Sequence, residues 1–369
     1  MNDINLIEKL YEISGPVLQL RIASELMDKP PCDIEELAQK ALDQTEVQKY
    51  MEYYRNGASQ GSSFNYKKML HGATPDKLGN VAGKLWSLGM RQGVPALDHL
   101  LKPYISIMEK DFYSTNVNRA GYGIYYLAQF LSLLGYADVD SVACILQMRL
   151  DQIVDFVKQG RYDIYVDVKG YPKLPSSWRN ISKIIDPALT QYGEAKGEPP
   201  LPSLYDLLGI AGMKQVGMTA ENEAKAELIL KYCFDERYQK GILNQYGILL
   251  TPAGQYYSMG WSVHMPGYGQ VLNKDAEINK LLLWADILSP FKASRELTLF
   301  KNLVEFLEDY KTKDGFYCFP RKFIPDEKRG YFVSGKYMGL NEERTKKEAN
   351  LAESTFRALR LKKNLGMQA

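Results

Sequence analysis

The sequence has 369 residues, of which 45% are hydrophobic and 24% are charged, as is ordinary for a globular protein with a large core. Its formal net charge of +2 argues against a nucleic-acid partner that is recognised mainly through its phosphates. No apolar run approaches the roughly 20 residues that span a bilayer, and the start MNDINLIEKLYEI lacks the regions of a signal peptide. We therefore expect a cytoplasmic protein without a membrane span.

Tyrosine is the unusual component of this composition. There are 26 Tyr residues, against 13 Phe and 4 Trp, and a ring with a polar tip suits pocket walls and interfaces. The four cysteines are far apart, and no Cys or acidic residue stands at close helical spacing to any of the three histidines. The sequence therefore predicts no metal site, and it contains no nucleotide-binding glycine motif that would indicate a cofactor.

Helical spacing dominates the N-terminal region. Leu18, Ile22 and Leu26 fall four apart, which predicts one buried helix face. Pro30 and Pro31 are expected to end that helix, and Asp33 to cap the next one. A helix-turn-helix that binds DNA is an alternative, but it lacks a basic recognition helix. We interpret residues 1–75 as a helical lead-in that packs on a domain formed by residues 76–369, with one continuous domain as the alternative.

A helical hairpin recurs along residues 76–369. Its first helix ends in a run rich in Leu and aromatic residues that Gly or Pro closes, and Gly is the usual left-handed C-cap. These runs are KLWSLG (84–89), QFLSLLG (129–135), SLYDLLG (203–209) and KLLLWADILSP (280–290). An amphipathic second helix follows each run, at 96–110, 141–157, 222–234 and 295–307, and leads into an aromatic loop. A last helix, 352–363, matches the first helix of one more unit.

Such repeats bury their apolar faces against their neighbours and form one array. Strand patterns are weak, apart from a short candidate pair in YDIYVDV (162–168) and GYFVSG (330–335). The sequence alone thus predicts an all-α protein built from helical hairpins.

Three stretches carry a resemblance to a known group of proteins. They are VLQLRIASELMD (17–28), KDGFY (313–317) and ESTFRAL (353–359). Paired helices with such exit loops resemble the α/α-toroid proteins, which include terpenoid cyclases and protein prenyltransferases. The resemblance implies two concentric layers of helices with a cavity at the mouth of the inner ring. It does not imply the relatives' chemistry, because the cyclase DxDD motif, the DDxxD magnesium motif and the prenyltransferase zinc set are all missing.

The stretch from Leu249 to Gly269 is the strongest candidate for a pocket wall. It brings Tyr256, Tyr257, Trp261, His264 and Tyr268 into a loop punctuated by Gly and Pro between two helical segments. His264 is a candidate acid or base, because an imidazole titrates near neutral pH. The alternative is that the aromatic loop plugs a core and that the histidine is structural.

Two further pairs are weaker candidates. Asp163 and Asp167 flank a short apolar run, and two carboxylates that face one cavity can divide acid and base roles. Trp178 and Arg179 could clamp a planar or anionic ligand, since Arg stacks on rings and donates in a fork. The alternatives are solvated loop carboxylates and a surface loop held by one tryptophan.

Two single residues complete the candidate site. His71 begins the turn HGAT before a helix and could bind a ligand or cap the helix. Tyr317 lies in the exit loop KDGFY and is a candidate ligand contact. If the predicted exit loops gather at one rim, both residues would join the pocket.

These features predict binding of a small organic molecule, apolar or sugar-like, in an aromatic-lined cavity. An isoprenoid chain and a carbohydrate both suit aromatic walls. An enzyme acting on that ligand would be a lyase, a transferase or a hydrolase. The alternative is a non-catalytic helical repeat scaffold that binds a protein or peptide.

Overall fold

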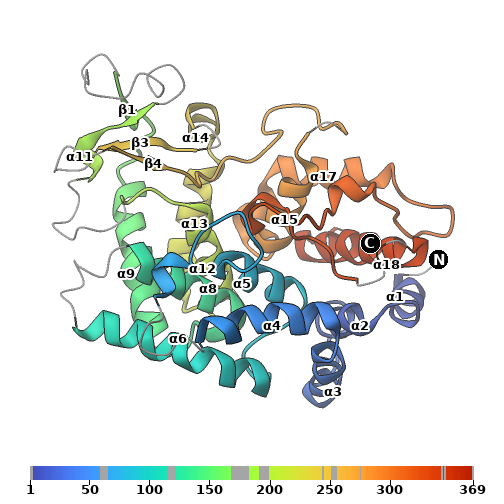
Figure 1. Ribbon diagram of the computed structural model, residues 1–369. Helices are drawn as coiled ribbons and strands as arrows, with labels where there is room; N and C mark the ends of the chain where they lie inside the picture. Colours follow the sequence, from blue (N-terminus) through green and yellow to red (C-terminus); the bar gives the residue numbers. More distant parts are fainter. Residues whose placement is uncertain are drawn as a thin grey trace.

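The computed structural model is predominantly helical (Figure 1). It describes residues 3–58, 65–114, 122–167, 183–190, 199–242, 245–250, 256–274, 276–341, 344 and 346–367. The chain begins with four helices, α1 (Asp3–Glu12), α2 (Pro16–Glu25), α3 (Pro31–Leu42) and α4 (Thr45–Ala58). Helix α3 has Pro30 as its N-cap, so Asp33 lies in its first turn and the prediction that Asp33 is the cap is wrong.

The helices of the predicted hairpins are present. Their first helices are α5 (Leu78–Ser87), α8 (Tyr122–Leu131), α12 (Leu204–Val216) and α15 (Ile278–Leu288), and the last helix is α18 (Lys347–Leu365). The second helices are α6 (Pro95–Ser114), α9 (Asp140–Val157), α13 (Ala220–Phe234) and α17 (Thr298–Glu308), and α8 and α9 also contact each other. Shorter helices are α11 (Pro187–Thr190), α14 (Glu236–Gly241) and α16 (Lys292–Glu296).

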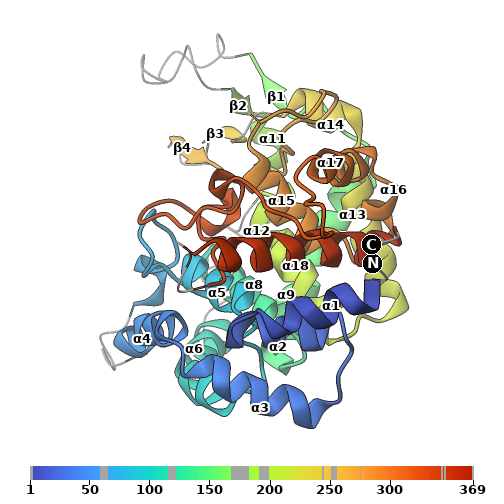
Figure 2. The same ribbon diagram turned by 90° about the vertical axis from the view of Figure 1, so that its right-hand side faces the viewer.

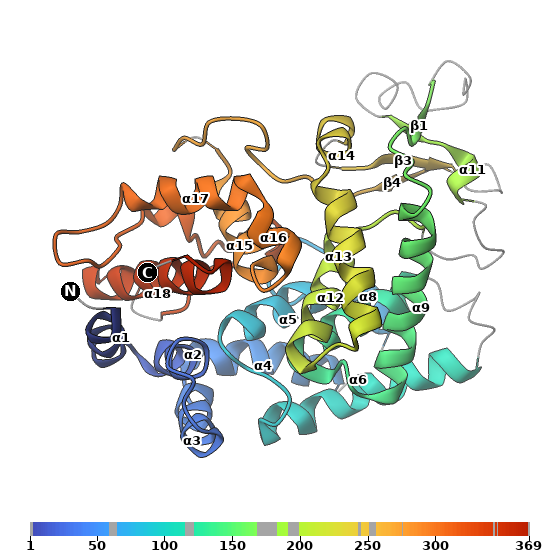
Figure 3. The same cartoon turned by 180° about the vertical axis from the view of Figure 1, so that it is seen from behind.

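Burial differs among the paired helices. All ten residues of α5 and ten of the eleven residues of α15 are buried, as expected of a helix that is surrounded by others. The buried residues of α17, in contrast, are spaced three and four apart along one face. The first helices α5, α8, α12, α15 and α18, which we call the inner helices, contact one another in that order, and α18 also contacts α1 and α2 (Figures 2 and 3).

The N-terminal helices share the core of the rest of the chain. Helix α4 packs on α5 and α6, and α2 packs on α18. The buried apolar residues of α1–α4 belong to the same hydrophobic cluster as those of the inner helices. A boundary near residue 75 stays a prediction. Among the described residues, no helix is long and apolar enough to span a membrane.

A small sheet corrects the expectation of an all-α protein. Its strands are β1 (Tyr165–Val166), β2 (Ile184–Ile185), β3 (Gly247–Leu250) and β4 (Tyr256–Met259), in the order β1-β2-β3-β4. The pairs β1–β2 and β3–β4 are antiparallel, whereas β2 and β3 are parallel. The sheet stands at one end of the molecule beside α11 and α14 (Figure 1). The segment YDIYVDV contributes β1, but GYFVSG forms the 3₁₀ helix η6 (Phe332–Ser334), so the predicted strand pair is wrong.

The prediction that Gly209 ends a helix is also wrong. Helix α12 continues to Val216, and the glycines at 209 and 212 face α8 and the π-helical turn η3 (Ser132–Tyr136) that follows it. A Cβ on Gly212 would lie 2.1 Å from the Ser132 carbonyl oxygen. Glycine is needed here for a close helix contact. At Gly135, where φ is 97°, it serves as the predicted left-handed turn.

We expect Gly212→Ala to lower the free energy of unfolding by about 1–3 kcal/mol, because the added methyl overlaps backbone that cannot move aside. Urea unfolding followed by circular dichroism measures this change. Gly241→Ala is the matched control, since Gly241 also lies in a helix but a Cβ there would lie 4.0 Å from its nearest neighbour. The control should be neutral or slightly stabilising. Equal effects of the two substitutions would contradict the close-contact explanation.

The segment before α18 fills the space between inner helices. The backbone N–H of Phe332 donates to the Asn80 side chain at 2.8 Å, and the Trp284 indole donates to the Val333 carbonyl at 2.9 Å. A Cβ on Gly83 would lie 2.1 Å from the Phe332 ring. The 3₁₀ helix η6 is therefore packed tightly between α5 and α15.

Candidate functional site

Five aromatic side chains from five separate segments meet near the starts of the inner helices. They form what we call the aromatic cluster: His71, Tyr126, Tyr205, Trp261 and Tyr331. Neighbouring ring centroids are 4.4 Å apart for His71–Tyr126, 5.1 Å for Tyr126–Tyr205, 5.4 Å for Tyr205–Trp261 and 4.6 Å for Trp261–Tyr331. Tyr205 is buried and the other four are half-buried. Four of the five residues are therefore partly accessible to solvent.

Asn80 joins two of these segments. Its side-chain amide donates to the carbonyl oxygens of Gly72, Thr74 and Gly330 at 2.9–3.2 Å. The Gly330 N–H also donates to the Ala73 carbonyl at 2.8 Å. One buried residue of α5 thus holds the turn after His71 against the residue that precedes Tyr331, although about 250 residues of sequence separate them.

The backbone of Trp261 has a conformation that few residues adopt. Its φ is +64°, in the left-handed region that is costly for a non-glycine residue, and such residues concentrate at functional sites. The Trp261 carbonyl accepts a hydrogen bond from the Leu204 N–H at 2.8 Å, and Ser262 pairs with Ser203 in a β-bridge. These bonds hold Trp261 against the start of α12, next to Tyr205.

His71 is the polar member of the cluster. Its Nδ1 atom is buried and has no hydrogen-bond partner among the described residues. Burial lowers the pKa of His71 to about 4, so its imidazole is neutral at pH 7. A neutral imidazole both donates and accepts a hydrogen bond, and one of these capacities is unused within the described part of the chain.

His264 lies three residues beyond Trp261 in a segment that a glutamine fixes. The Gln239 side chain donates to the Val263 carbonyl at 2.8 Å and accepts from the Met265 N–H at 2.9 Å, which brackets the histidine on both sides. Burial, together with the charge of Lys280, lowers the pKa of His264 to about 4. Its Nδ1 also has no partner in the segments that the structure describes.

Lys280 is a neighbour of His264 that was not predicted from the sequence. It is buried in the first turn of α15, and desolvation lowers its pKa. In the sequence it stands in the apolar run INKLLLWADIL, where a lysine is unusual. That single charged residue at the start of an inner helix is the signal that could have identified it.

The structure therefore brings together two of the predicted residues, His71 and Trp261, whose rings are 6.4 Å apart and nearly parallel. To these it adds Tyr126, Tyr205 and Tyr331. None of the three stands out in the sequence, because they resemble ordinary residues of an apolar helix or loop.

The other predicted residues have other surroundings. Tyr256 and Tyr257 lie on β4, and Tyr257 is 52% exposed. Tyr268 donates to the Phe234 carbonyl at 2.7 Å, and buried Tyr317 donates to Glu308 at 2.6 Å. Ligand contacts by these tyrosines stay predictions.

The remaining candidates are polar loop residues. Asp163 and Asp167 are exposed on either side of the strand β1, and their catalytic role stays a prediction. Trp178 and Arg179 lie outside the described residues. Within the described ranges, no three His, Cys, Asp or Glu side chains are grouped closely enough to hold a metal ion.

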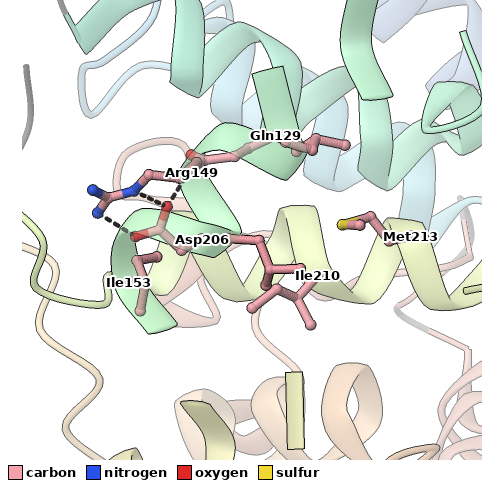
Figure 4. A pocket seen from close by; sticks show the side chains of 8 residues that line it. Gln129, Arg149, Ile153, Asp206, Ile210 and Met213 are labelled. Atoms are coloured by element: carbon pink, nitrogen blue, oxygen red, sulfur yellow. Dashed lines mark hydrogen bonds and ion pairs between the residues drawn. The ribbon is translucent and has the colours of Figure 1, made fainter. Parts of the chain in front are cut away.

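A buried ion pair includes Asp206, the residue that follows Tyr205 in α12. Asp206 accepts two hydrogen bonds from the Arg149 guanidinium, both at 2.9 Å (Figure 4). The pair borders a cavity of about 10 Å³ between α8, α9 and α12, which is room for about one water molecule. The Gln129 Oε1 atom, on the same cavity, has no partner among the residues described.

A larger cavity of about 330 Å³ lies elsewhere, between the starts of α2, α4 and α18. Its lining mixes apolar side chains with Glu46, Lys346 and Glu348. None of the aromatic cluster lines it. Comparison of the chain with family models, curated proteins and solved structures finds no match.

Proposed function

We propose that this protein binds a carbohydrate at the aromatic cluster. The observation that carries the proposal is the combination of partly accessible aromatic residues with the unpartnered Nδ1 atom of His71 in the described part of the chain. A sugar presents C–H groups on the faces of its ring and hydroxyl groups around its edge. It can therefore cover the faces of Trp261 and Tyr331, and a hydroxyl that reaches the buried Nδ1 atom of His71 would supply the hydrogen bond that this atom lacks.

An isoprenoid chain fits the same surface less well. Its hydrocarbon would cover the rings, but it would leave the already buried Nδ1 atom of His71 without a hydrogen bond. Leaving such a polar group unpaired costs about 1–3 kcal/mol. The neutral state of both histidines at pH 7 also favours an uncharged ligand with hydroxyl groups over an anionic one.

We further propose that the helices form an α/α toroid, with the aromatic cluster at its mouth. The succession of contacts from α5 through α8, α12 and α15 to α18, followed by the contact of α18 with α2, supports a closed inner layer. The contact of α8 with α9 and the one-sided burial of α17 support an outer layer. Tyr126 and Tyr205 lie in the first two turns of α8 and α12, which places the cluster at the N-terminal ends of inner helices.

If the bound sugar is transformed, His264 is our candidate acid–base residue. Gln239 bonds to the backbone on both sides of it, so the position of the His264 backbone is fixed. The His264 pKa of about 4 leaves the imidazole unprotonated at pH 7, the state that a base requires, and makes it a weaker base than an ordinary histidine. Unchanged turnover by a folded His264→Ala variant would remove it from this role.

Titration calorimetry with a panel of neutral oligosaccharides tests the binding proposal. We expect Trp261→Ala to weaken binding at least tenfold, because losing an aromatic anchor costs about 2 kcal/mol and about 1.4 kcal/mol corresponds to a factor of ten. Tyr113→Ala is the control, since Tyr113 is 72% exposed on α6 and lies outside the cluster.

Two results would count against the proposal. One is that no sugar in the panel binds the wild-type protein. The other is that Trp261→Ala binds as tightly as the control. Capture of a peptide in place of a sugar would favour the alternative of a protein-binding scaffold.

A further inference from the structure

We propose that Arg149 and Asp206 are positioning residues that hold the aromatic cluster in place. The expected effect of this ion pair on ligand binding rests on the proposed carbohydrate site. Its expected effect on the position of Trp261, which we call the structural arm, can be tested without a ligand.

The ion pair fixes the chain that leads into α12. Both residues are about 3% exposed. Beyond its two bonds to Asp206, the Arg149 guanidinium donates to the carbonyl oxygens of Pro199 and Leu201 at 3.0 Å. A planar guanidinium donates in fixed directions, so these bonds set the path of residues 199–201 relative to α9.

Asp206, which Arg149 holds in place, in turn fixes the position of Ser203. One carboxylate oxygen accepts both the backbone N–H and the hydroxyl of Ser203 at 2.8 Å. The Asp206 N–H donates back to the Ser203 hydroxyl at 3.2 Å, which completes a capping box at the start of α12. Tyr205 lies between Ser203 and Asp206, so the capping box also fixes the backbone position from which the Tyr205 side chain projects.

The start of α12 then holds Trp261. Ser203 pairs with Ser262, and the Leu204 N–H donates to the Trp261 carbonyl at 2.8 Å. The left-handed backbone of Trp261 persists only where its surroundings impose it. Asp206 also accepts from Gln129, which lies on α8 about one turn after Tyr126. One buried carboxylate is thus connected to the segments that carry three members of the cluster.

The bonding pattern explains why an ion pair is present. A well-packed apolar pair would often stabilise the fold as much as a buried ion pair does. It would not reach the two carbonyl oxygens and the two Ser203 donors in defined directions. The geometry therefore points to positioning as the role of the pair.

Fluorine NMR of protein labelled with 5-fluorotryptophan tests the structural arm. The 4 tryptophans give separate signals, and the one that Trp261→Phe removes belongs to Trp261. We expect Arg149→Lys, which keeps the positive charge but loses the planar fork, to shift or broaden the Trp261 signal. In the same variant, binding of the oligosaccharide that the wild type binds should weaken by about tenfold, or about 1.4 kcal/mol.

Arg357→Lys is the matched control. Arg357 is also a buried arginine with a buried aspartate partner, Asp286, which lies near the C-terminal end of α15. The Arg357→Lys substitution should shift or broaden the Trp86 or Trp284 signal and leave the Trp261 signal unchanged. A second variant, Ser203→Ala, keeps the ion pair but removes the hydroxyl of the capping box, and should shift the Trp261 signal even if Arg149→Lys does not fold.

The outcomes separate the two proposals. A shifted Trp261 signal without sugar binding supports positioning and contradicts the carbohydrate function. An unchanged Trp261 signal in folded Arg149→Lys and Ser203→Ala overturns the positioning role. An equal shift in Arg357→Lys also overturns it, because the effect would then be a general loosening of the fold.

Discussion

Replacing Asp286 with alanine should lower the free energy of unfolding by about 3–5 kcal/mol, the cost of removing one partner of a buried ion pair. Asp286 lies on α15, is 2% exposed and accepts from Arg357 at 3.5 Å and from Arg360. Without the Asp286 carboxylate, the buried guanidinium groups of Arg357 and Arg360 on α18 would each lose an acceptor of opposite charge. Burial already lowers the pKa of Arg357 and of Arg360 to about 10, so neither is placed to shed its charge near neutral pH.

Asp28→Asn is the matched control for this experiment, because asparagine removes the charge and tolerates the left-handed backbone of Asp28, whose φ is +49°. Asp28 also pairs with α18, through Lys363 at 3.0 Å, but its side chain is 76% exposed. An exposed ion pair contributes about 0–1 kcal/mol, so this substitution should have a small effect. Chemical unfolding of both variants at pH 7 gives the comparison. A loss below about 1 kcal/mol for Asp286→Ala would contradict a structural role for the buried network.

Acidification should destabilise the protein between about pH 6.5 and pH 4 through His71 and His264. The pKa of each is about 4 in the folded chain and about 6.5 when unfolded. Between these values the unfolded state binds more protons, so stability falls as the pH falls, and the loss is complete once the pH is below the folded pKa. At about 1.36 kcal/mol per pKa unit the loss is up to about 3 kcal/mol for His71. It is smaller for His264, where solvent screens the charge more.

The measurement is the free energy of unfolding as a function of pH for the wild type and for His71→Gln. Glutamine does not titrate, so the variant should lose less stability than the wild type across the same pH range. His99→Gln is the control, because His99 is exposed on α6 and belongs to neither the cluster nor its surroundings. Parallel pH profiles for the wild type and His71→Gln would show that His71 is not the source of the loss.

The helical framework could be predicted because its signals are local. Runs such as QFLSLLG and KLLLWADILSP combine apolar spacing with a terminal Gly or Pro, and the helices that carry them are present. The sheet could not be predicted because its strands are two to four residues long, too short for an alternating pattern. The role of Gly209 was not predictable either, because a glycine required by a close helix contact cannot be distinguished in sequence from one that ends a helix.

The candidate site could be predicted only in part, for a related reason. Trp261 and His71 are recognisable as aromatic or titratable residues in loops. Their companions Tyr126 and Tyr205 look like ordinary members of apolar helices, and only the packing of α8 against α12 reveals them. The Asn80 contacts that bring Tyr331 to the cluster span about 250 residues, and no local pattern encodes them.

The contact between the last helix and the first two bears on how the molecule unfolds. An open array of helical repeats depends on neighbours alone and can melt gradually from either end. Here α18 packs against α1 and α2, so the terminal helices of the chain cover one another (Figure 2). Fraying at either end would have to break this contact first. The chain is therefore expected to melt cooperatively, and distant defects such as those at Gly212 and Asp286 should displace one shared transition.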